Sequence, residues 1–155
     1  MTREERARQS AMNQIYQNVP FGREKLNGTF QSGDMWAVCD TYRFIRSKNR
    51  PQDIPESMGV NIDALVHDEY RQGEIVYLPT VSEIKEHIKA QGFTRVRKPG
   101  QIEALPGWWC NPFFLLDMVQ AMPDAVYYKP KNSCSPLYCE AEDGDALLCP
   151  IRHAA

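Results

Sequence analysis

Residues 33–43 read GDMWAVCDTYR, and residues 143–152 read DGDALLCPIR. Each stretch has a Gly-Asp turn, continues as an apolar strand and closes on a cysteine followed by an arginine. A helix stopped by a proline and one further strand precede the turn in both places, which is how an internal repeat is recognised. The sequence therefore predicts a duplicated unit of one helix and its strands.

The first half of the duplication spans about residues 4–46. Apolar residues between Met12 and Val19 recur at helical spacing, so we expect a helix over residues 4–18 that ends at Pro20. Two strands should follow, over residues 25–33 and 35–47. The second is expected to be continuous, because its side chains alternate between two faces along its whole length.

The second half spans about residues 101–152 and should contain one helix and three strands. Asn111 can cap a helix over residues 111–122, with Pro112 at its first position. The strands lie in AVYYKP, SPLYCEAE and DALLCPIR. Between the halves, residues 47–100 form a linker that contains an inserted helix near residues 80–91, capped by Thr80 or Ser82 and ended by Gly92.

Composition limits the class of protein. A chain of 155 residues is expected to form one domain, residues 1–155, and its net charge of −2 gives no overall attraction to nucleic acid. We expect no membrane span, because no apolar run approaches the roughly 20 residues required. The N-terminus has charges of both signs and no apolar run, so the expected location is the cytoplasm. The five cysteines contain no C-x-x-C pair, so neither a metal site nor another cofactor is expected.

Three of these stretches resemble the bacterial DNA polymerase III sliding clamp (beta subunit) family. DTYRF at residues 40–44 is similar to the family motif D-G-H-R-L, NPFFLLDMVQAMPDAV to its last helix, and SPLYCEAEDGDALLCPIR to its C-terminus. The resemblance covers about half of the chain. Thr41, Tyr42 and Cys149 replace the family's glycine, histidine and methionine, and residues 153–155 run past the usual end.

The resemblance implies an α+β, DNA-clamp-like domain. It would have two pseudo-symmetric halves, each a helix plus antiparallel strands, with an insertion at residues 80–91. Clamps are not enzymes, and they bind partner peptides in an apolar pocket. The residues that correspond to this pocket are Phe44, Cys149, Pro150 and Ile151, and Arg43 and Arg152 flank them, where either could pair with an acidic residue of the partner. In a one-domain chain we expect residues 43–44 and residues 149–152 to meet only across a protomer interface. The alternative is that Phe44 and Ile151 are core residues at strand ends.

The resemblance also raises binding of duplex DNA, which requires basic side chains facing phosphates. The first helix and its following loop provide Arg3, Arg6, Arg8, Arg23 and Lys25. Residues 111–122 contain Asp117 and no basic residue, so a solvated, charged helix end is an equal alternative. Trp108 and Trp109 are adjacent and cannot both enter one core from a strand, so an interface role is expected for this pair.

An enzyme remains the rival class. Cys110 lies just before a helix, where its thiol pKa would be lowered, and His67 or His87 could act as its base. We favour a non-enzymatic, replication-associated protein that acts through proteins carrying clamp-binding peptides. Whether it also binds duplex DNA as a ring of its own copies, or is a clamp-mimicking decoy or regulatory module, is left open by the sequence.

Overall fold

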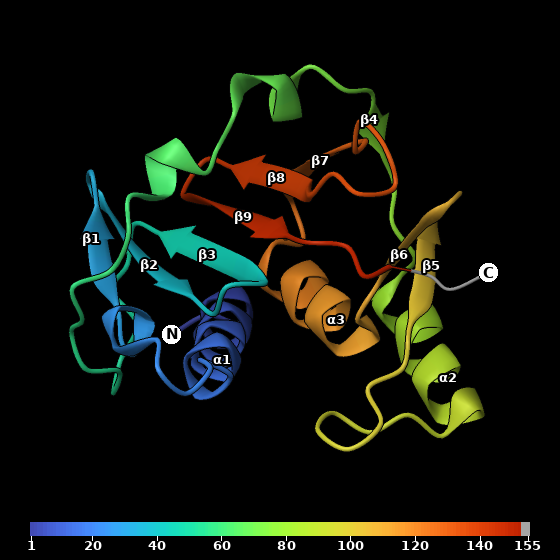
Figure 1. The fold of residues 1–155 in the computed structure, drawn as a ribbon, viewed down its shortest axis with the longest axis horizontal. Helices are drawn as coiled ribbons and strands as arrows, with labels where there is room; N and C mark the ends of the chain where they lie inside the picture. Colours follow the sequence, from blue (N-terminus) through green and yellow to red (C-terminus); the bar gives the residue numbers. More distant parts are fainter. Residues whose placement is uncertain (153–155) are drawn as a thin grey trace.

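The structure is a computed structural model that describes residues 1–152. Seven strands form one antiparallel sheet in the order β1-β2-β3-β9-β8-β7-β4, and the α-helices gather on one side of it (Figure 1). The sheet strands are β1 (Phe30–Ser32), β2 (Met35–Cys39), β3 (Arg43–Ser47), β4 (Ile75–Val76), β7 (Val126–Tyr128), β8 (Leu137–Ala141) and β9 (Gly144–Leu148). The helices are α1 (Arg3–Gln17), α2 (Val81–Gln91) and α3 (Pro112–Ala121).

The remaining elements are short. A separate hairpin is formed by β5 (Ile102–Leu105) and β6 (Trp108–Cys110). The 3-10 helices are η1 (Glu24–Leu26), η2 (Ile62–Ala64) and η3 (Asp68–Arg71). No helix within residues 1–152 has the length and hydropathy that crossing a bilayer would require. The prediction that residues 153–155 run past the usual end of a clamp domain concerns residues outside those described.

The strand order is symmetric about the pair formed by β3 and β9. Outward from this pair, β2 and β1 lie on one side and β8 and β7 on the other, with α1 packed against α3 below them. The two halves therefore contain equivalent elements. The equivalence of the two Gly-Asp turns is wrong, however, because Gly33 lies between β1 and β2 whereas Gly144 begins β9 after β8.

The continuous strand expected over residues 35–47 is also wrong, because the chain reverses at Asp40. The Asp40 Oδ1 atom accepts hydrogen bonds from the backbone N–H groups of Tyr42 and Arg43, both at 3.0 Å. Thr41, between Asp40 and Tyr42, has a φ of 81°, a value that turns the backbone sharply. An aspartate that bonds the backbone ahead of it favours a turn, so β2 and β3 become a hairpin.

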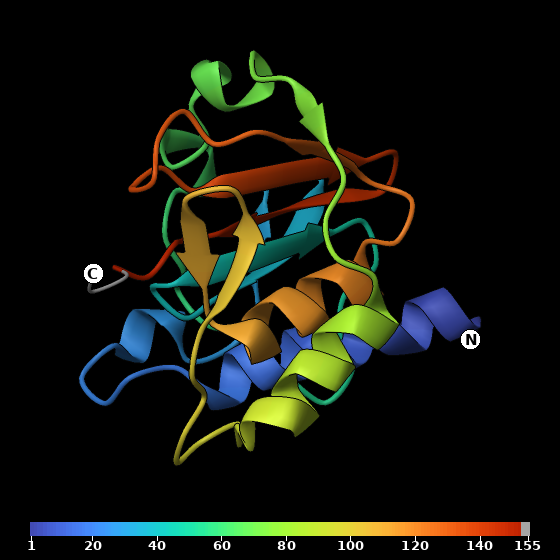
Figure 2. The same ribbon diagram turned by 90° about the vertical axis from the view of Figure 1, so that its right-hand side faces the viewer.

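The inserted helix is confirmed as α2. The Thr80 side chain accepts from the Glu83 N–H while the Glu83 carboxylate accepts from the Thr80 N–H, which is a capping box. Gly92 ends the helix with a φ of 67°. Figure 2 shows α2 alongside α3, and Ile84 is the residue that α2 buries there. The insertion therefore widens the helical layer.

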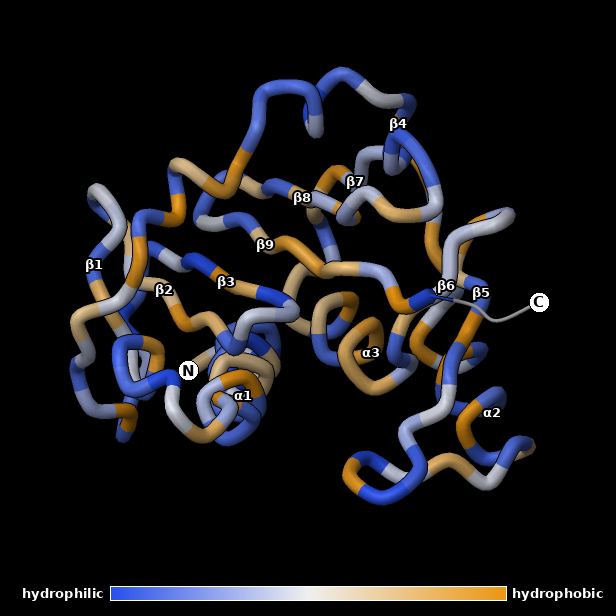
Figure 3. Tube along the Cα trace, in the orientation of Figure 1, coloured by the Kyte–Doolittle hydropathy of each residue, from blue (hydrophilic) through white to orange (hydrophobic). Residues whose placement is uncertain are grey.

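Each face of the sheet is covered. One apolar cluster fills the space between helices and sheet, and it includes Ile15, Leu115, Cys110 and Cys139. A second, the outer cluster, lies on the other face and comprises Leu26, Phe30, Ala37, Cys39, Phe44, Ile62, Tyr138 and Leu147. The segment with η2 and η3 crosses this face; it is partly apolar around η2 and hydrophilic around η3, whereas β9 and α3 are largely apolar (Figure 3).

Candidate partner-binding site

The C-terminal strip, residues 149–152, leaves β9 and runs toward the β5–β6 hairpin (Figure 1). The Cys149 N–H donates to the Tyr42 carbonyl oxygen at 2.8 Å, and the Ile151 N–H donates to the Trp109 carbonyl oxygen at 2.9 Å. Cys149, Pro150 and Ile151 are half-buried and Arg152 is exposed. Two backbone bonds thus hold the strip in place and leave part of its side chains at the surface.

The two sequence motifs meet inside one domain. Arg43 of β3 pairs directly with Leu148 of β9. The two motifs, residues 43–44 and residues 149–152, therefore begin at neighbouring positions of adjacent strands. The expectation that the motifs would meet only across a protomer interface is therefore wrong. The cause is the symmetry of the sheet, which brings the last strand of each half side by side.

Phe44 and Ile151 have different environments. The Phe44 side chain is 1% exposed and belongs to the outer cluster, together with Ile62. This is the core position that the alternative interpretation describes, whereas Ile151 stays half-buried at the surface. Strand alternation sends Phe44 away from the helices and Ile45 toward them.

Arg43 is occupied by the protein itself. Its Nε atom lies 3.0 Å from Asp40 Oδ2, and its Nη1 atom lies 2.8 Å from Asp117 Oδ2. Its guanidinium stacks 3.8 Å above the centre of the Phe114 ring. Arg95 completes the network with two bonds to Asp117, at 2.8 and 3.0 Å. An acidic partner residue therefore has Arg152 rather than Arg43 available to it.

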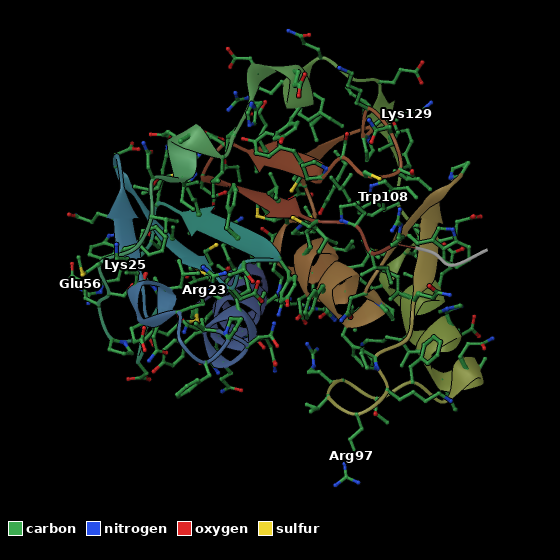
Figure 4. All side chains as sticks on the ribbon, in the orientation of Figure 1. Arg23, Lys25, Glu56, Arg97, Trp108 and Lys129 are labelled. Carbon is green, nitrogen blue, oxygen red and sulfur yellow. The ribbon has the colours of Figure 1, made fainter. Side chains whose placement is uncertain are left out.

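The basic residues expected to face DNA are dispersed. Arg8 donates to the Ala121 carbonyl oxygen at 3.2 Å and pairs with Asp143 at 2.8 Å, so it acts within the fold. Arg3 and Arg6 remain exposed near the start of α1. Figure 4 shows Arg23 just before η1 and Lys25 within it, with Glu56 near Lys25. The charge on this side is therefore mixed in sign.

The inserted segment carries basic residues that the sequence analysis did not place on the helical side. Lys85 and Lys89 are exposed on α2, and Arg97 is exposed on the loop that follows, where Figure 4 shows it pointing away from the domain. The signal was present in the sequence as a cluster of arginine and lysine near residue 97. The position of this cluster on the helical side could not be predicted, because it depends on where α2 packs.

The side chains of Trp108 and Trp109 have different environments, as is expected for adjacent residues of one strand. Trp108 is 3% exposed, and its indole N–H donates to the Ser135 carbonyl oxygen at 2.8 Å. It belongs to the core of this chain rather than to an exterior surface (Figure 4). Trp109 is half-buried beside the C-terminal strip. An interface role for Trp109 stays a prediction.

Cys110 is not an activated thiol. It is fully buried in the cluster between helices and sheet, and burial raises the pKa of its thiol far above the ordinary value. The expected lowering by the helix N-terminus is outweighed, because removal from water penalises the thiolate. The His87 Nε2 atom lies 3.0 Å from the Gln101 carbonyl oxygen, and exposed His67 lies against the Tyr70 ring.

The symmetric sheet with α1 and α3 on one face defines a clamp-like α+β domain. No family model matches the sequence, and no curated protein matches it either. Among solved structures, the fold is similar to that of the Helicobacter pylori beta clamp bound to a DNA ligase peptide, with a TM-score of 0.57 and 13% identity. The match covers 93% of this chain and 63% of that chain. At this identity the similarity shows the fold alone.

Proposed function

We propose that this chain is a non-enzymatic protein of DNA replication that binds short peptide segments of partner proteins along its C-terminal strip. The observation that carries the proposal is the pinning of the strip between Tyr42 and Trp109, which presents Ile151 at the surface. The clamp-like fold supports it, because the similar beta clamp was solved with a DNA ligase peptide bound.

The surroundings of the strip define the chemistry of its partner. Tyr42 is 52% exposed, and Trp109 and Ile151 are half-buried, so apolar surface is available for an aliphatic or aromatic anchor. Arg152 is exposed beside them and can pair with an acidic residue of the peptide. An extended peptide with both features fits the site.

Replacing Ile151 with aspartate should weaken peptide binding without unfolding the chain. With the DNA ligase peptide as the labelled probe, fluorescence anisotropy should show the Kd rising at least about tenfold, since loss of an anchor costs more than roughly 1.4 kcal/mol. Ile75→Asp is the matched control, because Ile75 is exposed on the edge strand β4, three strands away from β9 in the sheet. Equal affinity for the Ile151→Asp variant and the unchanged chain would exclude the strip as the binding site.

Peptide binding is favoured over encirclement of DNA by this chain alone. A DNA track needs basic residues along the whole helical layer, but those exposed on α1 and α2 are separated by α3, which has none, and Arg8 is bonded within the fold. A peptide-binding domain of this kind suits a regulator or decoy that competes for clamp-binding segments.

Light scattering should therefore report a monomer. A molar mass of 17.8 kDa is expected to persist as protein concentration rises and salt falls. A closed assembly of several copies would contradict this expectation and restore a DNA ring as the function. Adding duplex DNA of defined length at low salt provides the complementary control, since electrostatic binding is strongest there.

A further inference from the structure

Residues 61–72, the strap, cover the apolar face that contains Phe44. Ile62 is 1% exposed within the outer cluster, and Val66 and Tyr70 pack against the same cluster. The Tyr70 ring centre lies 6.5 Å from that of Tyr138 on β8. Figure 1 shows η2 and η3 passing over the sheet on the side opposite the α-helices. The strap therefore occupies the site that surrounds Phe44.

The strap is attached without strand pairing. It consists of η2, η3 and the turns between them. Its backbone hydrogen bonds include local ones, such as the bond that the Val66 N–H donates to the Ile62 carbonyl oxygen. Its ion pairs to the sheet are partly solvent-exposed: Asp63, which bonds Arg46 at 2.7 Å, has a side chain that is 74% exposed, and Arg71, which bonds Glu140 at 3.1 Å and the Tyr138 hydroxyl at 3.2 Å, has one that is 38% exposed. Exposed ion pairs contribute little to stability. Apolar contacts of a few side chains, together with the contacts that Arg71 makes with β8, provide its attachment.

Each polar side chain of the sheet that bonds the strap keeps at least one other partner when the strap is absent. Arg46 has two bonds to Asp145, at 2.7 and 2.6 Å, in addition to the one to Asp63. The Tyr138 hydroxyl donates to Asp145, and the Tyr128 hydroxyl donates to Glu140. Removal of the strap therefore leaves no buried charge unpaired on this face, which is the usual obstacle to local opening.

We infer that the strap is a displaceable cover, and that an acidic partner segment with apolar anchors four residues apart binds in its place. This inference rests on the proposed function, and it names the part of the peptide site that is closed in the free protein. The strap itself supplies the pattern, with Ile62, Val66 and Tyr70 as anchors and Asp63 facing Arg46. Cys149 packs on the same cluster, so the covered site adjoins the C-terminal strip.

Native cysteines report whether the strap opens by itself. Cys39 belongs to the outer cluster with Ile62, whereas Cys110 and Cys139 are fully buried in the other cluster. Burial raises the pKa of all three thiols, so each should react only when it becomes exposed. Alkylation with iodoacetamide, followed by mass spectrometry, should modify exposed Cys134 first, half-buried Cys149 second, Cys39 next, and Cys110 and Cys139 only on global unfolding.

Ile62→Ala should increase the alkylation rate of Cys39 at least about tenfold, because it removes the most buried contact of the strap. The rate at Cys139 should stay within about twofold. Leu65→Ala is the matched control, since Leu65 lies on the same strap and is 44% exposed. Asp63→Asn changes an exposed group and should raise the Cys39 rate about threefold while the chain keeps its fold, because Arg46 retains Asp145. Alkylation of Cys39 and Cys139 at one common rate in every variant would overturn the cover.

A synthetic peptide of residues 60–72 tests the docking site separately. It should bind the Ile62→Ala chain at least about tenfold more tightly than the unchanged chain, because the unchanged strap competes for the same surface. A control peptide with alanine at the positions of Ile62 and Tyr70 should not bind. Failure of the strap peptide to bind an opened chain would overturn the docking site. If the strap peptide binds but the DNA ligase peptide does not, the proposed function fails and the cover stands.

Discussion

Replacing Phe44 with aspartate is expected to unfold the chain even though the strap can be displaced, because the new carboxylate would still lie among the sheet residues of the outer cluster, such as Phe30 and Leu147. Phe44 is 1% exposed in the outer cluster, so the change removes a buried aromatic ring, which costs about 3–5 kcal/mol. It also places a carboxylate in an apolar environment, at a further cost of several kcal/mol. Arg46 cannot compensate, because Asp145 and Asp63 already bond its guanidinium. The sum is comparable to the whole stability of a domain, about 5–15 kcal/mol.

Circular dichroism and urea unfolding measure this effect. The Phe44→Asp variant should show no cooperative transition at 25 °C, whereas Phe44→Leu should keep the fold and lose about 1 kcal/mol, since it nearly conserves volume and polarity. Ile151→Asp provides the contrast, because a half-buried residue at the surface can turn a new charge toward water. A Phe44→Asp chain that unfolds at the same urea concentration as the unchanged chain would place Phe44 outside the core.

The difference between Phe44 and Ile151 could not be read from the sequence. Both follow apolar strands and both match pocket positions of the clamp family, so pattern and resemblance treat them alike. What separates them is the strap, which covers one and not the other. The strap has neither helical nor strand periodicity over a useful length, and its path depends on contacts between residues distant in the chain.

The helices were predictable because their ends are local. The expected ranges 4–18, 80–91 and 111–122 correspond to α1, α2 and α3, and the caps at Thr80 and Asn111 form the bonds that their side chains suggest. The hairpin at Asp40 was missed because the alternation of side chains continues through it. The two hydrogen bonds that the Asp40 carboxylate accepts reverse the chain inside this alternating stretch of thirteen residues. The assignment of the Gly-Asp turns failed for the same reason: without that hairpin, the first half lacks a strand.

The role of Asp117 could not be predicted from the sequence either, because its partners are distant from it in the chain. In the sequence it marks α3 as acidic, which argues against a DNA surface. In the structure its carboxylate bonds Arg43 of β3 and Arg95 of the loop after α2. The charge is therefore neutralised within the fold. Asp117 joins the sheet, the helical layer and the inserted segment at one point.

Asp117→Ala should consequently destabilise the chain by about 3 kcal/mol, because Arg43 is 5% exposed and would lose one of its two carboxylate partners. For a chain of this size, that loss corresponds to a decrease in Tm of about 10 °C in a calorimetric scan. Arg95→Ala should have a smaller effect, since its side chain is 33% exposed and water can replace part of the interaction.

Asp143→Ala is the matched control for Asp117→Ala. Asp143 pairs with Arg8 at 2.8 Å, the same distance that separates Asp117 from Arg43, but the Asp143 side chain is 53% exposed. Breaking this surface pair should cost less than about 1 kcal/mol. If both variants lost the same stability, burial of the Arg43 network would have no energetic consequence, and the network could not be what fixes the inserted segment against α3.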